Sequence, residues 1–282
     1  MGFNLQHTKH MKRVGDFTVI AVSDGVLNTN HDVILGIDRA ESERLTGIVT
    51  GQPIPLDVNC FVIRYNGRDI LVDAGSGHTM GPTLGQLPKN LRAIGIAPEA
   101  IETILITHLH PDHSLGLLDE AGRAVFPKAT LVVHEIEVAF WLDRRPQPND
   151  SERVTRNTKA QRTVTAPYRE RIRRITDGEV LPGVSAMLRP GHTPGHTNWL
   201  IQSGGDRLLI WGDIVHLASV QMARPDATLV FDVEPQIARA TRERVLDWAA
   251  TEHLRVAGAH LGFPGFGHVV RTGQGFSYAP EM

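Results

Sequence analysis

The chain has 282 residues, of which 41% are hydrophobic and 21% charged, and its formal net charge is −2. It is long enough for one large domain or two small ones, and its apolar content excludes intrinsic disorder. The weak negative charge argues against nucleic-acid binding. A single cysteine, Cys60, excludes an intramolecular disulfide framework and a cluster of thiolate metal ligands.

Residues 1–16 are polar and basic, and we expect them to form a flexible segment ahead of one domain over residues 17–282. They lack the continuous apolar stretch of a secretory signal peptide. No other window approaches the roughly 18 apolar residues of a membrane span. These patterns predict a cytoplasmic protein without a membrane partner.

The hydrophobic pattern predicts two blocks of strands, each followed by helices. In the first block, Asp24-Gly25 and Asn66-Gly67 are turn signals, and residues 28–56 are expected to form a loop with one short helix. The charged residues 145–175 are interpreted as a solvated helix face. The expected strands of this block are 17–23, 59–65, 69–73, 101–107 and 130–134, and the expected helices are 84–94 and 135–144.

The second block repeats this rhythm without a low-complexity linker, so we expect both blocks to form one domain. Mixed α/β chains of this kind can bury two sheets face to face with helices outside, in a four-layer αββα sandwich. The expected elements are strands over 184–189, 197–202, 207–211 and 255–259 and a helix over 236–252.

Residues of metal-ligand type concentrate where predicted strands end. Side chains two apart in an extended chain point the same way, so His108 and His110 can face one ion. Pro111 then breaks the run and allows the next residues to open a helix, turned toward a neighbouring position. Histidine and carboxylate ligands suit Zn²⁺ or another divalent ion. The candidates are His108, His110, Asp112, His113, His192, Asp213 and His260.

These motifs resemble the ordered motifs of the metallo-β-lactamase superfamily over residues 17–271. They are Leu-Val-Asp-Ala-Gly at 71–75, His-Leu-His-Pro-Asp-His at 108–113, Gly-His-Thr-Pro-Gly-His at 191–196, and Gly212-Asp213. The resemblance implies the αββα fold and two divalent ions per chain, Zn²⁺ before Mn²⁺, Fe²⁺ or Co²⁺.

The resemblance also implies a role for each site residue. One ion would be held by His108, His110 and His192. The other would be held by Asp112, His113 and His260, with Asp213 bridging the two. Asp73 and His196 would orient the site without binding metal.

One group of β-lactamases in the superfamily needs a cysteine as a metal ligand between the third histidine and the last one. Cys60 lies too far upstream to be that ligand, so this β-lactamase chemistry is disfavoured. Residues 212–221 and 259–269 resemble methyl parathion hydrolase and its lactonase-like relatives. That branch implies a homodimer that cleaves a lactone or aryl ester with a metal-bridging hydroxide, and organophosphate triesters as a side activity. Asp112 or Asp213 would pass a proton to the leaving alkoxide.

Two further residues have roles that the resemblance leaves open. His216 stands where acyl-homoserine lactonases have a tyrosine that assists the substrate carbonyl, and it is expected to donate a hydrogen bond there. Trp141, within Phe140-Trp141-Leu142, either lines the substrate pocket or is a core aromatic on an amphipathic helix.

Two other functions compete with this interpretation. A thioester hydrolase of the glyoxalase II type shares all seven ligands, but it needs a basic C-terminal pocket, and residues 253–282 contain only Arg255 and Arg271. A catalytically silent metal-binding module should have lost ligands, and none is missing from the sequence.

Overall fold

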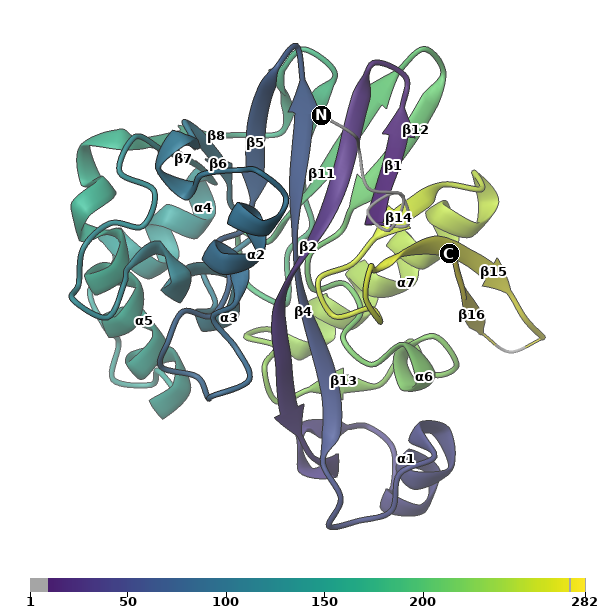
Figure 1. Cartoon of the computed structure of the whole chain (residues 1–282). Helices are drawn as coiled ribbons and strands as arrows, with labels where there is room; N and C mark the ends of the chain where they lie inside the picture. Colours follow the sequence, from purple (N-terminus) through teal and green to yellow (C-terminus); the bar gives the residue numbers. More distant parts are fainter. Residues whose placement is uncertain (1–9, 274, 282) are drawn as a thin grey trace.

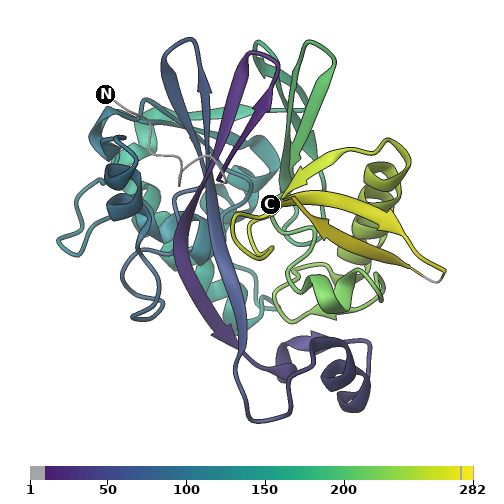
Figure 2. The same cartoon turned by 45° about the vertical axis from the view of Figure 1, so that its right-hand side comes forward.

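The computed structural model describes residues 10–273 and 275–281. Within them, two seven-stranded sheets run in the orders β1-β2-β4-β5-β6-β7-β8 and β16-β15-β14-β12-β11-β10-β9, and β3 pairs with β13. Figures 1 and 2 show helices on both outer faces of the sheets. The predicted αββα sandwich is therefore confirmed.

The strands of the first sheet are β1 (Met11–Val14), β2 (Phe17–Thr29), β4 (Ile54–Tyr65), β5 (Arg68–Val72), β6 (Thr103–Leu105), β7 (Thr130–His134) and β8 (Ile172–Ile175). Those of the second sheet are β9 (Gly178–Leu181), β10 (Val184–Leu188), β11 (Thr197–Ser203), β12 (Asp206–Ile210), β14 (Arg255–Ala257), β15 (Phe266–Arg271) and β16 (Phe276–Pro280). The small pair is β3 (Ile34–Leu35) and β13 (Thr228–Leu229). The helices are α1 (Arg39–Thr46), α2 (Leu87–Ala93), α3 (Pro111–Ser114), α4 (Glu135–Val138), α5 (Glu152–Thr165), α6 (Ala218–Gln221) and α7 (Pro235–Thr251).

The layers follow from the two-residue period of the strands. On β2, Val19 and Ala21 enter the core between the sheets, whereas Ile20 and Val22 enter the core beneath the helices. Helices α2, α4 and α5 pack over the outer face of the first sheet. Helix α7 covers the second sheet with Val245 and its apolar neighbours. None of the described helices is long and apolar enough to cross a bilayer.

The structure differs from three local expectations, namely the turn at Asp24-Gly25, the loop over residues 28–56 and the flexible segment over residues 1–16. Asp24-Gly25 is not a turn but an irregularity within β2, where the register with β4 shifts and Gly25 adopts φ 126°. Glycine tolerates this left-handed conformation, so the strand continues through a bulge instead of reversing. Residues 28–56 consequently contain the end of β2, the start of β4 and α1, which is the expected short helix.

The N-terminal segment was expected to be flexible over residues 1–16. Residues 1–9 lie outside the described residues, so that part stays a prediction. Met11–Val14 instead form β1, which pairs with β2 from Met11↔Ile20 to Val14↔Phe17. The reason is that Val14 buries its side chain completely, and backbone pairing satisfies the polar groups around it.

Candidate metal centre

The site is built from loops that follow strands of both sheets. Strand β6 ends at Leu105 and leads into residues 107–113, where Pro111 opens α3 and His110 precedes the helix in extended conformation. This is the geometry that the sequence predicts for Pro111. The loops after β10, β12 and β14 bring in His192, Asp213 and His260. Ligand-type residues far apart in the sequence thus meet at one edge of the sandwich.

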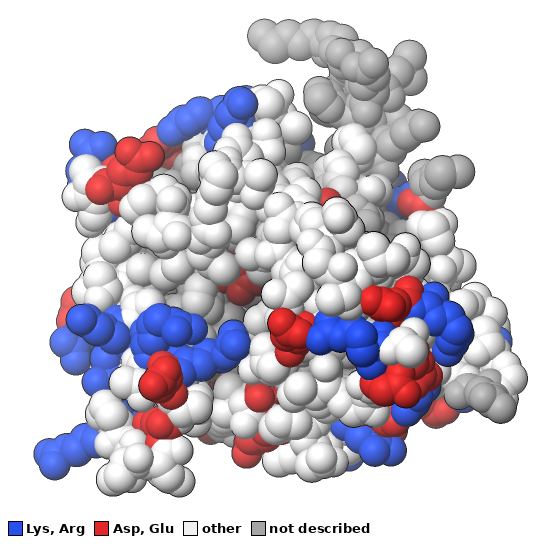
Figure 3. Space-filling view, turned by 90° about the horizontal axis from the view of Figure 1, so that it is seen from below, with Lys and Arg blue, Asp and Glu red and all other residues white. Residues whose placement is uncertain are grey.

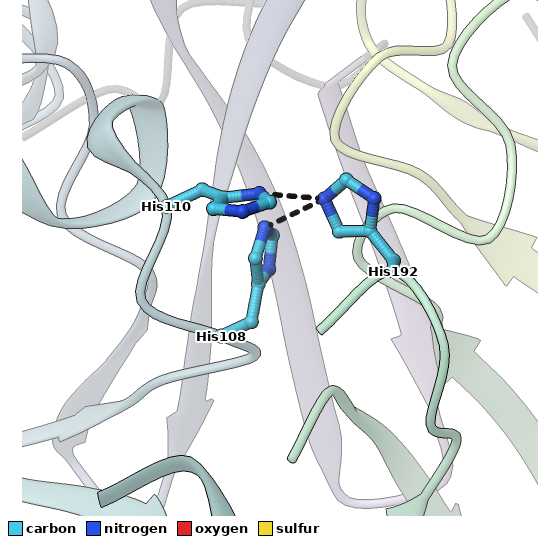
Figure 4. Close-up of side chains that lie close together, drawn as sticks. All are labelled: His108, His110 and His192. Atoms are coloured by element: carbon cyan, nitrogen blue, oxygen red, sulfur yellow. Dashed lines mark hydrogen bonds between the residues drawn. The ribbon is translucent and has the colours of Figure 1, made fainter. Parts of the chain in front are cut away.

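Three histidines converge in the first group (Figure 4). His192 Nε2 lies 2.8 Å from His110 Nδ1 and 3.1 Å from His108 Nε2. All three rings are buried, and burial holds the pKa of His108 and of His110 well below 6.5. Neutral imidazoles keep a free lone pair, so His108 and His110, together with His192 once its Nε2 has lost its proton, form a suitable cradle for a cation.

Four residues form a second group beside the first. His113 Nε2 lies 3.1 Å from Asp213 Oδ1, and His260 Nε2 lies 3.2 Å from Asp213 Oδ2 and 3.3 Å from Asp112 Oδ2. Asp213 Oδ2 is also 3.2 Å from His192 Nε2. The carboxylate of Asp213 therefore lies between the two groups, where the sequence predicts a bridging residue.

The donor set fits divalent ions. Within each group the potential ligand atoms lie within 4.8 Å of one another. Although only 3.1 Å apart, His113 Nε2 and Asp213 Oδ1 are buried in the described part of the chain without forming a hydrogen bond, a costly state that a cation between them would relieve. Nitrogen and carboxylate oxygen are the ligands that zinc and similar ions accept. Which ion each residue binds stays a prediction.

Asp73 and His196 lie behind these groups. His113 Nδ1 donates to Asp73 Oδ2 at 2.8 Å, and the N–H of Thr107 donates to Asp73 Oδ1 at 2.8 Å. The backbone N–H of Asp213 donates to His196 Nε2 at 3.0 Å. Burial lowers the pKa of His196 to about 3, so its ring stays neutral and accepts this bond. Both residues can orient ligands, as the resemblance implies.

His216 lies at the edge of both groups. Its Nε2 is 2.9 Å from Asp213 Oδ2, and its ring stacks on His260 with the centroids 5.0 Å apart. With His192 and Asp213 it forms a third combination that could hold an ion. The structure thus brings His216 to the site, and its hydrogen bond to a substrate carbonyl stays a prediction.

Two buried carboxylates were missed by sequence reasoning. Asp232 Oδ1 lies 2.8 Å from His192 Nδ1 and fixes the far side of that ring. Glu137 accepts bonds from the backbone N–H of Leu109 at 2.7 Å and from Thr193 Oγ1 at 2.7 Å. It therefore connects the loop of His108 and His110 with the loop of His192.

Trp141 is buried in this structure. Its side chain is fully buried in the core beneath the helices, and its Nε1–H donates to Glu137 Oε1 at 2.8 Å. This burial and the bond to Glu137 favour the core alternative, and the role of Trp141 toward a substrate stays a prediction. One sequence pattern could have indicated this contact. Glu137 and Trp141 are four residues apart on a predicted helix, so their side chains are neighbours on one face.

A cavity of about 350 Å³ opens above the metal-binding residues. It is lined by His110 and His192 of the first group and by Asp112, Asp213 and His260 of the second, so both groups can be reached from it. Arg153 and Arg156 of α5 also line it. Arg156 is exposed, as the interpretation of residues 145–175 as a solvated face predicts, whereas Arg153 is partly buried where α5 borders the cavity.

Such a cluster of histidines and carboxylates, at the edge of an αββα sandwich, defines a metal-binding protein of hydrolase type. The model of the metallo-beta-lactamase superfamily matches residues 53–260, and the chain belongs to this superfamily.

Two solved structures are similar over nearly the whole chain. One is a hydrolase of the beta lactamase superfamily, AbOPH, with a TM-score of 0.91, 29% identity and 97% coverage of both chains. The other is AidC, a dizinc quorum-quenching lactonase in complex with the product N-hexanoyl-L-homoserine. It has a TM-score of 0.90 and 26% identity, covering 96% of this chain and 97% of that one.

Curated relatives are more distant. An N-acyl homoserine lactonase of Bacillus thuringiensis is 24% identical over 177 residues, which are 56% of this chain and 63% of that protein. An acyl-coenzyme A thioesterase of Gallus gallus is 28% identical over 179 residues, 57% of this chain and 59% of that protein. The matched regions thus span less than two thirds of these relatives.

Proposed function

We propose that the protein is a dinuclear metal-dependent hydrolase that cleaves a lactone or aryl ester. The observation that carries this proposal is the position of Asp213 between two groups of ligand atoms, at the floor of a cavity large enough for a small substrate. The similarity to lactonases supports the substrate class. Organophosphate triesters are proposed as a side activity, as in the methyl parathion hydrolase branch.

Two bound divalent ions would polarise the substrate carbonyl and lower the pKa of a shared water to about 7, giving hydroxide at neutral pH. The protein residues hold this arrangement. Asp213 fixes the separation of the two groups, and Asp73 and Asp232 fix the rings of His113 and His192. Asp112, Asp213 and His216 line the cavity. Asp112 or Asp213 would pass a proton to the leaving alkoxide, and His216 would donate a hydrogen bond to the carbonyl oxygen.

A thioester hydrolase is the second candidate. It is favoured by the similarity to an acyl-coenzyme A thioesterase, and the same site could attack a thioester carbonyl. A catalytically silent metal-binding module is disfavoured, because the seven predicted ligands form two adjoining groups and five of them line an open cavity, whereas structural metal sites are closed.

The test combines metal analysis with a substrate panel. Protein loaded with Zn²⁺, and in parallel with Mn²⁺, Fe²⁺ or Co²⁺, should contain about two ions per chain. It is then assayed with aryl esters, lactones of varied ring and chain, glutathione and acyl-coenzyme A thioesters, and phosphotriesters. We expect the highest kcat/KM for a lactone or aryl ester. A clear preference for a thioester would establish the second candidate, and absence of bound metal would refute both.

A further inference from the structure

Helix α5 places two arginines on one side of the cavity. Arg153 and Arg156 are three residues apart, so their side chains leave the helix on the same face. We call this pair the basic wall. Figure 3 shows the hollowed face of the molecule, with basic side chains gathered over the part that contains α5.

The basic wall lacks counter-charges. Other arginines nearby are neutralised, as Arg144 is by Asp150 at 3.0 Å and Arg174 is by Asp143 at 2.6 Å. Among residues 10–273 and 275–281, no carboxylate forms an ion pair with Arg153 or Arg156. Like charges one helical turn apart repel each other, and here nothing from the described chain offsets that repulsion.

Arg153 is also held in place. It is partly buried, and burial together with the charge of Arg156 lowers its pKa. Its guanidinium lies 5.1 Å from the centre of the Phe231 ring, a residue that lines the same cavity. A cation–π contact of this kind orders the side chain without neutralising it. The hydrogen-bond donors of the guanidinium remain available to a ligand.

The rest of the cavity is lined by two kinds of side chain, apolar ones and metal-binding ones. Apolar side chains line it beside the basic wall, namely Leu27, Leu56, Met80, Leu115 and Phe231. The metal-binding residues form its floor. A molecule that fills this space therefore meets a metal-binding floor, apolar walls and two free guanidinium groups.

We propose that the basic wall binds an anionic group of the substrate, a carboxylate or a phosphate, at the end remote from the bond that is cleaved. This inference rests on the proposed function and narrows it to lactones or esters with an acidic substituent. Guanidinium is suited to both anions because it donates two parallel N–H bonds to them. In the reaction water adds, the acyl C–O bond breaks to give a carboxylic acid and an alcohol, and the anionic group is unchanged.

The experiment compares two esters that differ in one charge. Mono-4-nitrophenyl adipate carries a free carboxylate, and its methyl ester is neutral but of similar length. The metal-loaded enzyme is assayed with both, alongside the double variant Arg153→Gln/Arg156→Gln. Lys159→Gln is the matched control, because Lys159 is an exposed cation on the same helix that does not line the cavity.

We expect the wild type to prefer the anionic ester, and the double variant to lose about 10- to 100-fold in kcat/KM for it. The neutral ester and the Lys159→Gln enzyme should change less than threefold. Charge reversal in Arg153→Glu/Arg156→Glu should turn the preference toward an ester that carries a quaternary ammonium. Equal losses in Lys159→Gln, or no preference in the wild type, would overturn the inference.

Binding tests the inference separately from catalysis. Calorimetry with hexanoate and with butyl phosphate, on wild type and double variant, shows which anion the basic wall prefers. If neither ester is hydrolysed but one anion binds more weakly to the double variant than to the wild type, the proposed ester chemistry is refuted and anion binding by the basic wall is supported. If both esters are hydrolysed and each anion binds equally to the wild type and the double variant, the ester chemistry is supported and anion binding by the basic wall is refuted.

Discussion

Asp232 Oδ1 and His192 Nδ1 are 2.8 Å apart, and both side chains are buried. Although burial acts in the opposite direction, the hydrogen bonds with Asp213 and Asp232 raise the pKa of His192 to about 9 in the metal-free chain. A divalent ion bound by His192, as proposed, would displace that proton from Nε2. Asp232 would then hold the remaining proton on Nδ1, which leaves the Nε2 lone pair available to the ion.

Asp232→Asn should therefore weaken metal binding. An amide is a poorer acceptor for the Nδ1 proton and can also present an N–H to it, so we expect a loss of about 10- to 100-fold in affinity for one ion. Competition with a chelator measures this affinity. Glu120→Gln, which removes an exposed carboxylate elsewhere, is the control. Unchanged affinity would show that His192 is oriented without Asp232.

Glu137→Gln should loosen the connection between the two histidine loops. The carboxylate accepts four hydrogen bonds, from Leu109, Trp141, Thr193 and Gly195. In glutamine, an NH₂ group replaces one of the two oxygens and cannot accept the bonds of the donors that face it. We expect the free energy of unfolding to fall by about 1–3 kcal/mol, with lower metal affinity. Denaturant titration measures the first, and Glu135→Gln, exposed on the same helix, is the control. An unaltered unfolding midpoint would contradict this role.

Asp213→Ala should abolish turnover and release at least one ion. Removal of the carboxylate leaves His113 and His260 without the charge between them, so the two groups no longer share a ligand. Elemental analysis after dialysis measures the metal content, and the ester assay measures the activity. Full metal content with normal turnover would refute the bridging role.

His216→Ala separates two roles for this ring. If His216 only donates a hydrogen bond to the substrate carbonyl, kcat should fall by about 100-fold while both ions are retained. Metal analysis of the same sample makes the distinction. Loss of an ion would instead identify the combination of His192, Asp213 and His216 as a binding group.

Trp141→Phe tests the assignment of this residue to the core. The ring volume is largely retained, but Glu137 loses the indole donor, so we expect a loss of about 1–2 kcal/mol in the free energy of unfolding. The ratio of kcat/KM for short and long esters should stay constant, because Trp141 is fully buried and does not line the cavity. A changed ratio at unchanged stability would return Trp141 to the substrate pocket.

The sequence alone was sufficient for the sandwich and for the seven predicted ligands that meet at the site. Strand periodicity is local, so the alternation around Val19 and Ile20 could be read directly from the chain. The run from His108 to His113 is equally local, because its geometry depends on an extended dipeptide and on Pro111. His192, Asp213 and His260 were found through their motifs, and the structure brings them to the same edge.

Tertiary structure decided what no local pattern contains. Asp232 follows its partner His192 by 40 residues, and their hydrogen bond exists only because the chain returns to the loop after β10. The surroundings of Trp141 and of Arg153 depend likewise on how their helices pack. The indole of Trp141 contacts a buried carboxylate and the guanidinium of Arg153 lines the cavity because of how the helices pack. Such surroundings are set by contacts between elements that are distant in the sequence.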